Sequence, residues 1–432
     1  MSRVVVVGGG LAGTATAARL AKQRHDVVLL ERRDRLGGDL GFVERDGYRW
    51  DAGPTSTALP AVLRDLFRKS GRPLERELEL VPVDPMRRHV FPDGTSLDLP
   101  SGSRSAQLDA VDAALGRGLG RQWVDYVHRH ADAWDLLRRG YLEHPWSPDH
   151  GQRSTRALLR TRTSLQRAVA RTLTDDRLRA VATHAARLDG HDPRRVPWWL
   201  GTWSYVEQNF GRWTVPGGMG LLAEAMTKRL RERRVDTRLG TTARDVTVRD
   251  GRAVGVETDA GTVPADVVVC AVDPRGLPRL RRHAGRSRPA LPPSVCHLGL
   301  TAAPELPAEV VLHGDPLLLV RSGGTAPEGA AAWTVLSRGA TDEDVLVSLA
   351  RRGLDIRGLV GVRVDRSPAD QVRELGGSSY GVRWHGRRTV DRTLRPLPVP
   401  GVYAAGAHAA VAAEIPLVGL TASVAAQRIG PA

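Results

Sequence analysis

The start of the chain carries the clearest chemical pattern. An apolar run, Val4 to Val7, is followed by Gly8, Gly10 and Gly13 in the spacing Gly-x-Gly-x-x-Gly. In such a turn the first glycine permits a sharp bend, and the second lets the backbone approach a diphosphate. The third lets the following helix pack closely against the strand. The pattern therefore predicts a strand, a turn and a helix that together bind a dinucleotide.

The neighbouring elements have the order that this chemistry needs. A helix is predicted from Leu11 to about residue 24, and the N–H groups of its first turn, including that of Ala12, would bind the phosphates. The apolar run 27–30 predicts a second strand that ends at Glu31. A carboxylate at this offset binds a ribose hydroxyl in dinucleotide-binding folds. We therefore interpret the segment as a complete β-α-β dinucleotide-binding unit.

The residues after Glu31 indicate which dinucleotide is bound. Arg32 leads to the pair Gly37-Gly38, and a hairpin with an Asp-Gly turn is predicted over 41–51. Gly53, Pro54 and Thr55 come directly after it. This order resembles the FAD-dependent amine oxidase and phytoene desaturase superfamily. The resemblance implies FAD contacts at Arg32, Gly37, Gly38, Gly53, Pro54 and Thr55.

Further motifs resemble the phytoene desaturase branch, also called the carotenoid desaturase branch. They are Gly190 to Arg194, the proline-glycine-glycine loop within 212–222, and the late pair of segments 367–370 and 376–381. Short strands are predicted over 235–274. The resemblance implies that the backbone near Ala243 meets the adenine of FAD.

A second strand-to-helix passage closes the chain. A strand ends at Gly406-Ala407, and a helix begins at Ile415, Pro416 and Leu417. Pro416 suits a first helical turn because the N–H that proline lacks would be unpaired there. In the related enzymes this helix N-terminus faces the pyrimidine end of the flavin. Its partial positive charge would stabilise the anionic reduced ring.

The chain departs from the family pattern in two places near the implied flavin. Asp39 follows the double glycine where the family usually has arginine, and residues 410–414 replace a His-Pro-Gly-Gly-Gly-like run. The larger side chains should narrow or reshape the space over the flavin ring. Glu414 either complements the helix dipole, or acts as a general base or anchor for a polar substrate group. His408 is either a catalytic histidine or a hydrogen-bonded structural one.

Several other kinds of chemistry find no support in the sequence. The only lysines are Lys22, Lys69 and Lys228, so the flavin-side lysine of amine oxidases has no obvious counterpart. Cys270 and Cys296 are the only cysteines, and neither lies near the C-terminal motif, which favours non-covalent FAD. No metal-ligand spacing is present, so no metal site is expected. No second nucleotide motif exists for a nicotinamide reductant, so electrons should pass to oxygen or a quinone.

Composition narrows the partners and the location. The 432 residues carry a formal net charge of +15, but no nucleic-acid-reading module accompanies it. Six arginines and no acidic residues lie in 151–174, where a single basic amphipathic helix is predicted. That helix is either a site for an anionic membrane surface or an ordinary solvated face. Two isolated cysteines and no secretion leader favour a cytoplasmic protein, with a peripheral membrane location as a further option.

These observations predict an α/β fold with a Rossmann-type FAD-binding domain and a discontinuous α+β substrate domain. The FAD-binding domain is assigned residues 1–75, 211–275 and 376–432, and the substrate domain 76–210 and 276–375. The leading functional hypothesis is an FAD-dependent desaturase that acts on a lipophilic polyisoprenoid or carotenoid-like substrate. The alternatives are an oxidase of a specialised natural product, amine or porphyrinogen, and a non-catalytic isoprenoid-binding escort protein.

Overall fold

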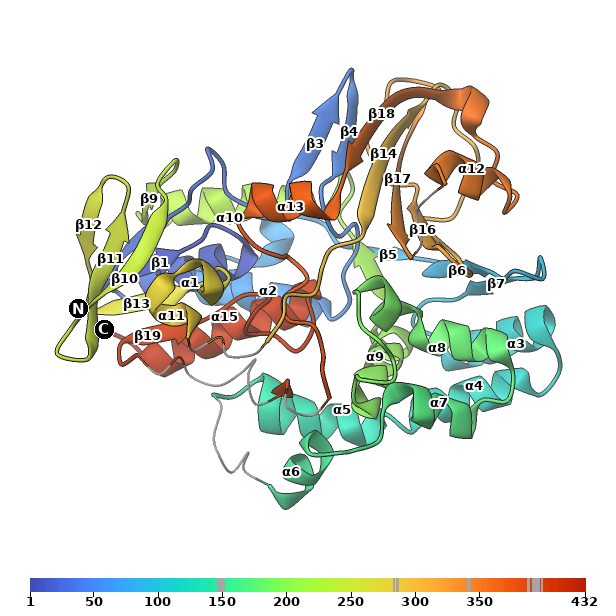
Figure 1. Cartoon of the computed structure of the whole chain (residues 1–432), viewed down its shortest axis with the longest axis horizontal. Helices are drawn as coiled ribbons and strands as arrows, with labels where there is room; N and C mark the ends of the chain where they lie inside the picture. The colour runs from blue at the N-terminus through green and yellow to red at the C-terminus, as the bar shows by residue number, and fades with distance from the viewer. Residues whose placement is uncertain are drawn as a thin grey trace.

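The fold is built from two main sheets, a smaller three-stranded sheet and a layer of helices. It is seen in a computed structural model that describes residues 1–145, 152–282, 284, 287–339, 343–386, 389–390, 397 and 399–432. The smaller main sheet and its helices lie on the left of Figure 1, the larger sheet lies at the upper right, and most of the remaining helices lie below it. The predicted α/β class is confirmed.

The first sheet has five parallel strands in the order β19-β13-β1-β2-β9. The bounds are β1 Arg3–Val7, β2 Asp26–Leu30, β9 Asp236–Arg238, β13 Val267–Cys270 and β19 Val402–Ala404. Four successive valines of β1 are buried. Burial of both faces explains why this strand is apolar throughout instead of alternating.

Each face of this sheet is covered by a different layer. Val4 and Val6 pack with helices α1 Leu11–Lys22, α2 Pro60–Ser70, α10 Gly220–Glu232 and α15 Ile415–Ile429. Val5 and Val7 point to the other face and pack against a three-stranded antiparallel sheet. Its strands are β10 Ala243–Arg249, β11 Arg252–Thr258 and β12 Gly261–Pro264. The two-residue period of a strand therefore divides this core into two clusters.

The second main sheet has seven strands in the order β18-β14-β17-β16-β15-β6-β7. The bounds are β6 Arg87–Val90, β7 Ser96–Leu99, β14 Ser294–Leu300, β15 Glu309–Leu312, β16 Leu317–Arg321, β17 Ala331–Arg338 and β18 Val360–Arg366. Only the pair β6 and β15 is parallel within the described residues. Two ribbons flank it: β3 Phe42–Arg45 with β4 Tyr48–Asp51, and β5 Val81–Val83 with β8 Arg212–Thr214. The first ribbon is the hairpin expected from the sequence, and it turns at Asp46-Gly47, both with positive φ.

A helical layer lies against one end of the larger sheet (Figure 1). Its helices are α3 Arg104–Leu115, α4 Leu119–His128, α5 Ala131–Leu137, α6 Arg153–Leu159, α7 Leu165–Thr172, α8 Asp176–Leu188 and α9 Thr202–Phe210. A π-helical turn, Arg138–Leu142, extends α5. The remaining helices are α11 Pro278–Arg281, α12 Val345–Ala350 and α13 Pro368–Leu375, with short 3-10 turns at Leu74–Arg76, Trp198–Gly201, Pro274–Gly276 and Arg357–Leu359.

The expectation of one basic helix over 151–174 is wrong. The described part of this segment forms two helices, α6 and α7, with a non-helical stretch between them. Ser164 is extended and accepts a hydrogen bond from the N–H of Arg167, so it caps the start of α7. The N–H of Leu165 donates to the carbonyl oxygen of Val196, at 3.0 Å. Local capping and this tertiary contact interrupt the arginine stripe that a continuous helix would have presented.

None of the helices in the described part of the chain has the length and hydropathy that a bilayer-spanning segment needs.

Candidate functional site

The glycine turn after β1 has the geometry that its sequence predicts. Gly8 has φ of +103°, a conformation that glycine adopts without strain. A Cβ atom placed on Gly13 would lie 1.9 Å from the carbonyl oxygen of Gly8, so only glycine lets α1 pack this closely. A Cβ on Gly10 would meet nothing nearer than Gly38, 3.9 Å away. Packing within the protein therefore leaves room for a side chain at Gly10, unlike at Gly13.

The start of α1 is left open for an anion. Gly10 caps the helix without any side-chain hydrogen bond, so the first-turn N–H groups of Leu11 and Ala12 remain available. The Gly37-Gly38 segment lies against this turn, because the N–H of Gly37 donates to the carbonyl oxygen of Gly9 at 2.8 Å. Two glycine-bearing loops thus form a backbone cradle at a helix N-terminus, which fits a diphosphate.

Glu31 lies at the carboxyl end of β2, beside this turn. Its carboxylate accepts hydrogen bonds from the N–H groups of Gly9, at 2.7 Å, and Arg33, at 2.9 Å. Each carboxylate oxygen can accept a second bond, so a ribose hydroxyl can still be held there. The carbonyl oxygen of Glu31 accepts from the N–H of Thr241, which places the segment leading to Ala243 next to Glu31.

Arg32 and Arg33 have different partners. The Arg32 guanidinium donates to the carbonyl oxygens of Arg373 and Glu374, at the end of α13. Arg33 donates to the Glu374 carboxylate and, unlike Arg32, also to the carbonyl oxygen of Gly38, each at 3.0 Å. The side chain that holds the double glycine in place is therefore that of Arg33, which the sequence did not single out.

The C-terminal motif returns to the same edge of the sheet. β19 pairs with β13, and a Cβ on Gly406 would lie 3.8 Å from the Cβ of Ala12. The N–H of Gly406 donates to Thr421 of α15 at 2.8 Å. Ala407 continues from there against Gly381. The two ends of the chain thus meet at the carboxyl ends of the parallel strands, where α/β folds bind their ligands.

The loop Gly53 to Thr55 is held from two sides. Arg321 of β16 donates to the carbonyl oxygen of Gly53 at 2.9 Å, and the Thr214 hydroxyl of β8 donates to that of Thr55 at 2.8 Å. Pro54 lies between these two anchors. A Cβ on Gly53 would lie 2.8 Å from the Asp39 carboxylate, so the unusual aspartate packs directly against this loop. Burial raises the pKa of Asp39 above its ordinary value.

A buried ionic cluster is connected to this loop through Arg321. Arg87 bonds to Glu309 at 2.9 Å and to Glu207 at 3.3 Å, and Arg212 bonds to Glu207 at 3.0 Å. Glu309 also lies 3.7 Å from Arg321, the residue that holds Gly53. Burial alone would raise the pKa of Glu309, but the Arg212 and Arg87 charges outweigh it and hold that pKa far below its usual range. These residues belong to five separate elements, so the cluster fixes their relative positions.

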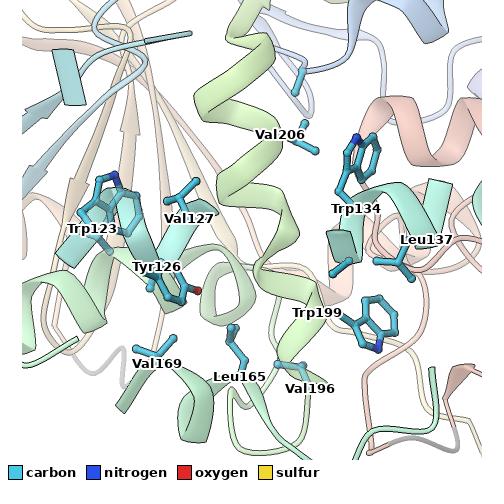
Figure 2. Packing of buried hydrophobic residues seen from close by; sticks show 14 of the residues in the cluster. Trp123, Tyr126, Val127, Trp134, Leu137, Leu165, Val169, Val196, Trp199 and Val206 are labelled. Atoms are coloured by element: carbon cyan, nitrogen blue, oxygen red, sulfur yellow. The ribbon is translucent and has the colours of Figure 1, made fainter. Parts of the chain in front are cut away.

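An apolar cavity extends from the helical layer to the start of α15. Figure 2 shows Trp134, Leu137 and Trp199 gathered on one side of the helix that carries Val206. The cavity is lined mainly by apolar and aromatic side chains, with a few polar ones: Trp134, Leu137, Leu142, Leu165, Val181, Ala182, His184, Ala185, Ala186, Asp189, His191, Trp199, Leu200, Gly201, Thr202, Trp203, Ser204, Glu207, Trp384, Val411, Ala412, Glu414 and Leu417. Val411 and Ala412, two residues of the 410–414 run, are among those that line this cavity.

Glu414 directly precedes α15 and faces this cavity. It occupies the N-cap position, yet its side chain makes no capping hydrogen bond. Burial raises its pKa above the ordinary value. Asp189, at the end of α8, lines the same cavity, and burial together with the nearby Glu414 charge raises its pKa to about 7. The cavity is therefore lined by two carboxyl groups with raised pKa values, and that of Asp189 can exchange a proton near neutral pH.

His408 has other partners. Its ring lies 3.8 Å from the Asp273 carboxylate and 3.4 Å from the Arg275 guanidinium. Burial lowers the pKa of His408, although the Asp273 charge acts in the opposite direction. His408 is not among the described residues that line the cavity. The structure therefore brings Glu414, but not His408, to the cavity.

Sequence reasoning missed three parts of the site. Asp189 lies next to the family-like segment 190–194, and that position was the only available signal. Arg321 and the ionic cluster had none, because their partners are far apart in the chain. The tryptophans were not missed, because the sequence predicts that those between Trp123 and Trp203 either line an apolar tunnel or belong to the core. Trp134, Trp199 and Trp203 line the cavity. Trp123 is buried and donates to Gln107 outside it.

Together, the cradle and the two returning chain ends form a site that fits a dinucleotide, and an apolar cavity adjoins it. The family of the protein follows from comparison. The model for the family described as "Flavin containing amine oxidoreductase" matches residues 11–429, and the chain belongs to this family. Membership implies FAD as the cofactor. The expected enzyme class, a flavin-containing oxidoreductase related to phytoene desaturases, is confirmed.

Two relatives show which branch of the family is similar. Hydroxyneurosporene desaturase from Cereibacter sphaeroides is 29% identical over 99% of this chain and 97% of its own length. A zeta-carotene-forming phytoene desaturase from Myxococcus xanthus is 32% identical over 63% of this chain, which spans 53% of that relative.

Solved structures show the same fold at low sequence identity. Putrescine oxidase bound to putrescine has a TM-score of 0.71 at 16% identity, covering 99% of this chain and 98% of the other. A putative protoporphyrinogen oxidase from an Exiguobacterium species has a TM-score of 0.65 at 17% identity, with the same coverage.

Proposed function

We propose that this protein is an FAD-dependent desaturase that removes hydride from a C–H bond of a lipophilic, polyisoprenoid or carotenoid-like substrate. The observation that carries the proposal is that the apolar cavity is lined by Glu414, the N-cap residue of α15, and by Leu417 of its first turn. That turn is where the family resemblance puts the flavin ring. A hydrocarbon chain in the cavity would therefore present a carbon atom at the ring. The names of the two desaturase relatives support the same substrate class.

The residues present fit non-covalent FAD. The turn of Gly8, Gly10 and Gly13, with Leu11, Ala12, Gly37 and Gly38, would bind the diphosphate, Glu31 the ribose and the backbone at Ala243 the adenine. Gly53 to Thr55, Gly406, Ala407 and Ile415 to Leu417 would surround the ring. Cys270 lies in β13 and is buried. Cys296 lies in β14 and is also buried. Neither thiol belongs to the segments that would surround the ring.

The bound flavin supplies an acceptor for hydride. The protein's own residues orient the substrate, exclude water and accept the second hydrogen as a proton. Loss of hydride from one carbon and of a proton from its neighbour leaves a carbon–carbon double bond. Glu414 is the proposed proton acceptor, because it lines the cavity and its raised pKa makes it a stronger base than an exposed glutamate. Reoxidation by oxygen or a quinone remains a prediction, as does contact with an anionic membrane.

The test is the visible spectrum of the purified holoenzyme under anaerobic conditions. A polyisoprenoid mixture should bleach the flavin absorbance, while a primary amine should not. Bleaching by the amine alone would replace the proposal with an amine oxidase. If the protein binds no flavin even after FAD is added, the alternative of a non-catalytic isoprenoid-binding escort protein would replace the proposal.

A variant tests the assigned base. Glu414→Gln keeps the size of the side chain but cannot accept the proton, so the rate of flavin reduction should fall about 10²–10⁴-fold with FAD still bound. Glu224→Gln, at an exposed position of α10 in a surface groove, is the matched control and should leave that rate unchanged. An unchanged rate in Glu414→Gln would show that Glu414 is not the base.

A further inference from the structure

The apolar cavity contains polar atoms that a plain hydrocarbon would leave unpaired. The indole N–H of Trp199 is buried and has no hydrogen-bond partner among the described residues, and the same is true of Trp203. Only 1% of the Trp199 surface is exposed. Both residues line the cavity together with Asp189. A buried donor without an acceptor is unfavourable, so such a group is expected to meet a ligand.

Asp189 is likewise free to bind a ligand. The nearby Arg338 guanidinium donates to the carbonyl oxygens of Leu188, Leu291 and Pro292, and makes no hydrogen bond to Asp189. Within the described part of the chain, no hydrogen bond to the Asp189 carboxyl group is found. Asp189 is half-buried and lines the cavity.

We propose that the cavity binds an isoprenoid chain that carries a hydroxyl group, which Asp189 and the Trp199 indole N–H recognise together. This proposal rests on the proposed function, because it specifies the substrate class of the same cavity. A hydroxyl group accepts a bond from the indole and also pairs with Asp189, as a donor or an acceptor, whichever protonation state Asp189 has. An ammonium group cannot accept the indole bond, and Asp189 and Glu414 would repel a carboxylate. A hydrocarbon would leave both Trp199 and Asp189 unpaired.

The test compares ligands that differ in one group. Geranylgeraniol, its deoxy hydrocarbon and the corresponding amine would be titrated against oxidised holoenzyme, with binding followed by tryptophan fluorescence. The alcohol should bind at least about tenfold more tightly than either of the others, the amount that one good hydrogen bond provides. Equal binding of alcohol and hydrocarbon, or tighter binding of the amine, would overturn the proposal. The wild-type series is informative even if a variant fails to fold.

Variants assign the preference to the two residues. Asp189→Leu should reduce the preference for the alcohol over the hydrocarbon to less than about threefold. Asp189→Asn keeps a donor and an acceptor and should therefore retain most of that preference. Trp199→Phe should weaken it, and Trp123→Phe is the matched control, since that indole already bonds to Gln107 outside the cavity. A full preference in Asp189→Leu would refute the assignment. Binding is measured without turnover, so failure of the desaturase proposal would appear separately as the absence of flavin bleaching.

Discussion

Gly10 and Gly13 lie in the same motif but should respond in opposite ways to a methyl group. At Gly10, an alanine Cβ would be 3.9 Å from its nearest neighbour, and the backbone has an ordinary φ of −72°. The cofactor-free Gly10→Ala protein should therefore be as stable as the wild type, or more stable by about 0.4–1 kcal/mol through its less flexible unfolded chain. At Gly13 the methyl group would lie 1.9 Å from the Gly8 carbonyl oxygen. That overlap should cost about 1–3 kcal/mol of unfolding free energy.

FAD binding should separate the two effects. The Gly10→Ala methyl group would occupy the approach of the diphosphate to the start of α1. Loss of two charge-assisted hydrogen bonds, at about 1.5 kcal/mol or more each, corresponds to roughly a hundredfold weaker binding. Denaturant unfolding of the cofactor-free protein and titration with FAD, followed by flavin fluorescence, measure the two quantities. Wild-type FAD affinity in Gly10→Ala, or destabilisation equal to that of Gly13→Ala, would refute the reasoning.

Three other changes probe the remaining parts of the site. Glu309→Gln should lower the unfolding free energy by about 3–5 kcal/mol, because it leaves buried arginines without their partner, whereas Asp355→Asn at the surface should leave a denaturant curve unchanged. Since the pKa of Asp189 rises from 3.8 to about 7 on folding, the native state retains that proton longer, and wild-type stability should fall between pH 4 and pH 7 relative to Asp189→Asn. A parallel pH profile in Asp189→Asn would contradict this. Ala412→Leu should fill the cavity and weaken substrate binding in the fluorescence titration without changing FAD affinity; unchanged substrate binding would show that the substrate lies elsewhere.

The sequence by itself determined the elements whose signals are local. The β-branched run of β1, the glycine turn and the start of α1 follow from short-range backbone rules, as does the hairpin with its Asp46-Gly47 turn. Pro416 placed the start of α15 correctly. Resemblance then supplied the family, which the comparison confirmed.

Tertiary structure alone decided what these elements bring together. Arg87, Glu207 and Glu309 come from distant segments, and no sequence pattern pairs them before the sheets assemble. The basic segment 151–174 satisfied the helical period, but the helix is interrupted between Leu159 and Leu165, where the Ser164 cap and a contact to Val196 outweigh the pattern. Asp189 carries no motif of its own, and its unusual pKa arises because folding buries it beside Glu414. Local rules specify backbone conformation, whereas burial and charge proximity exist only after distant parts of the chain have packed.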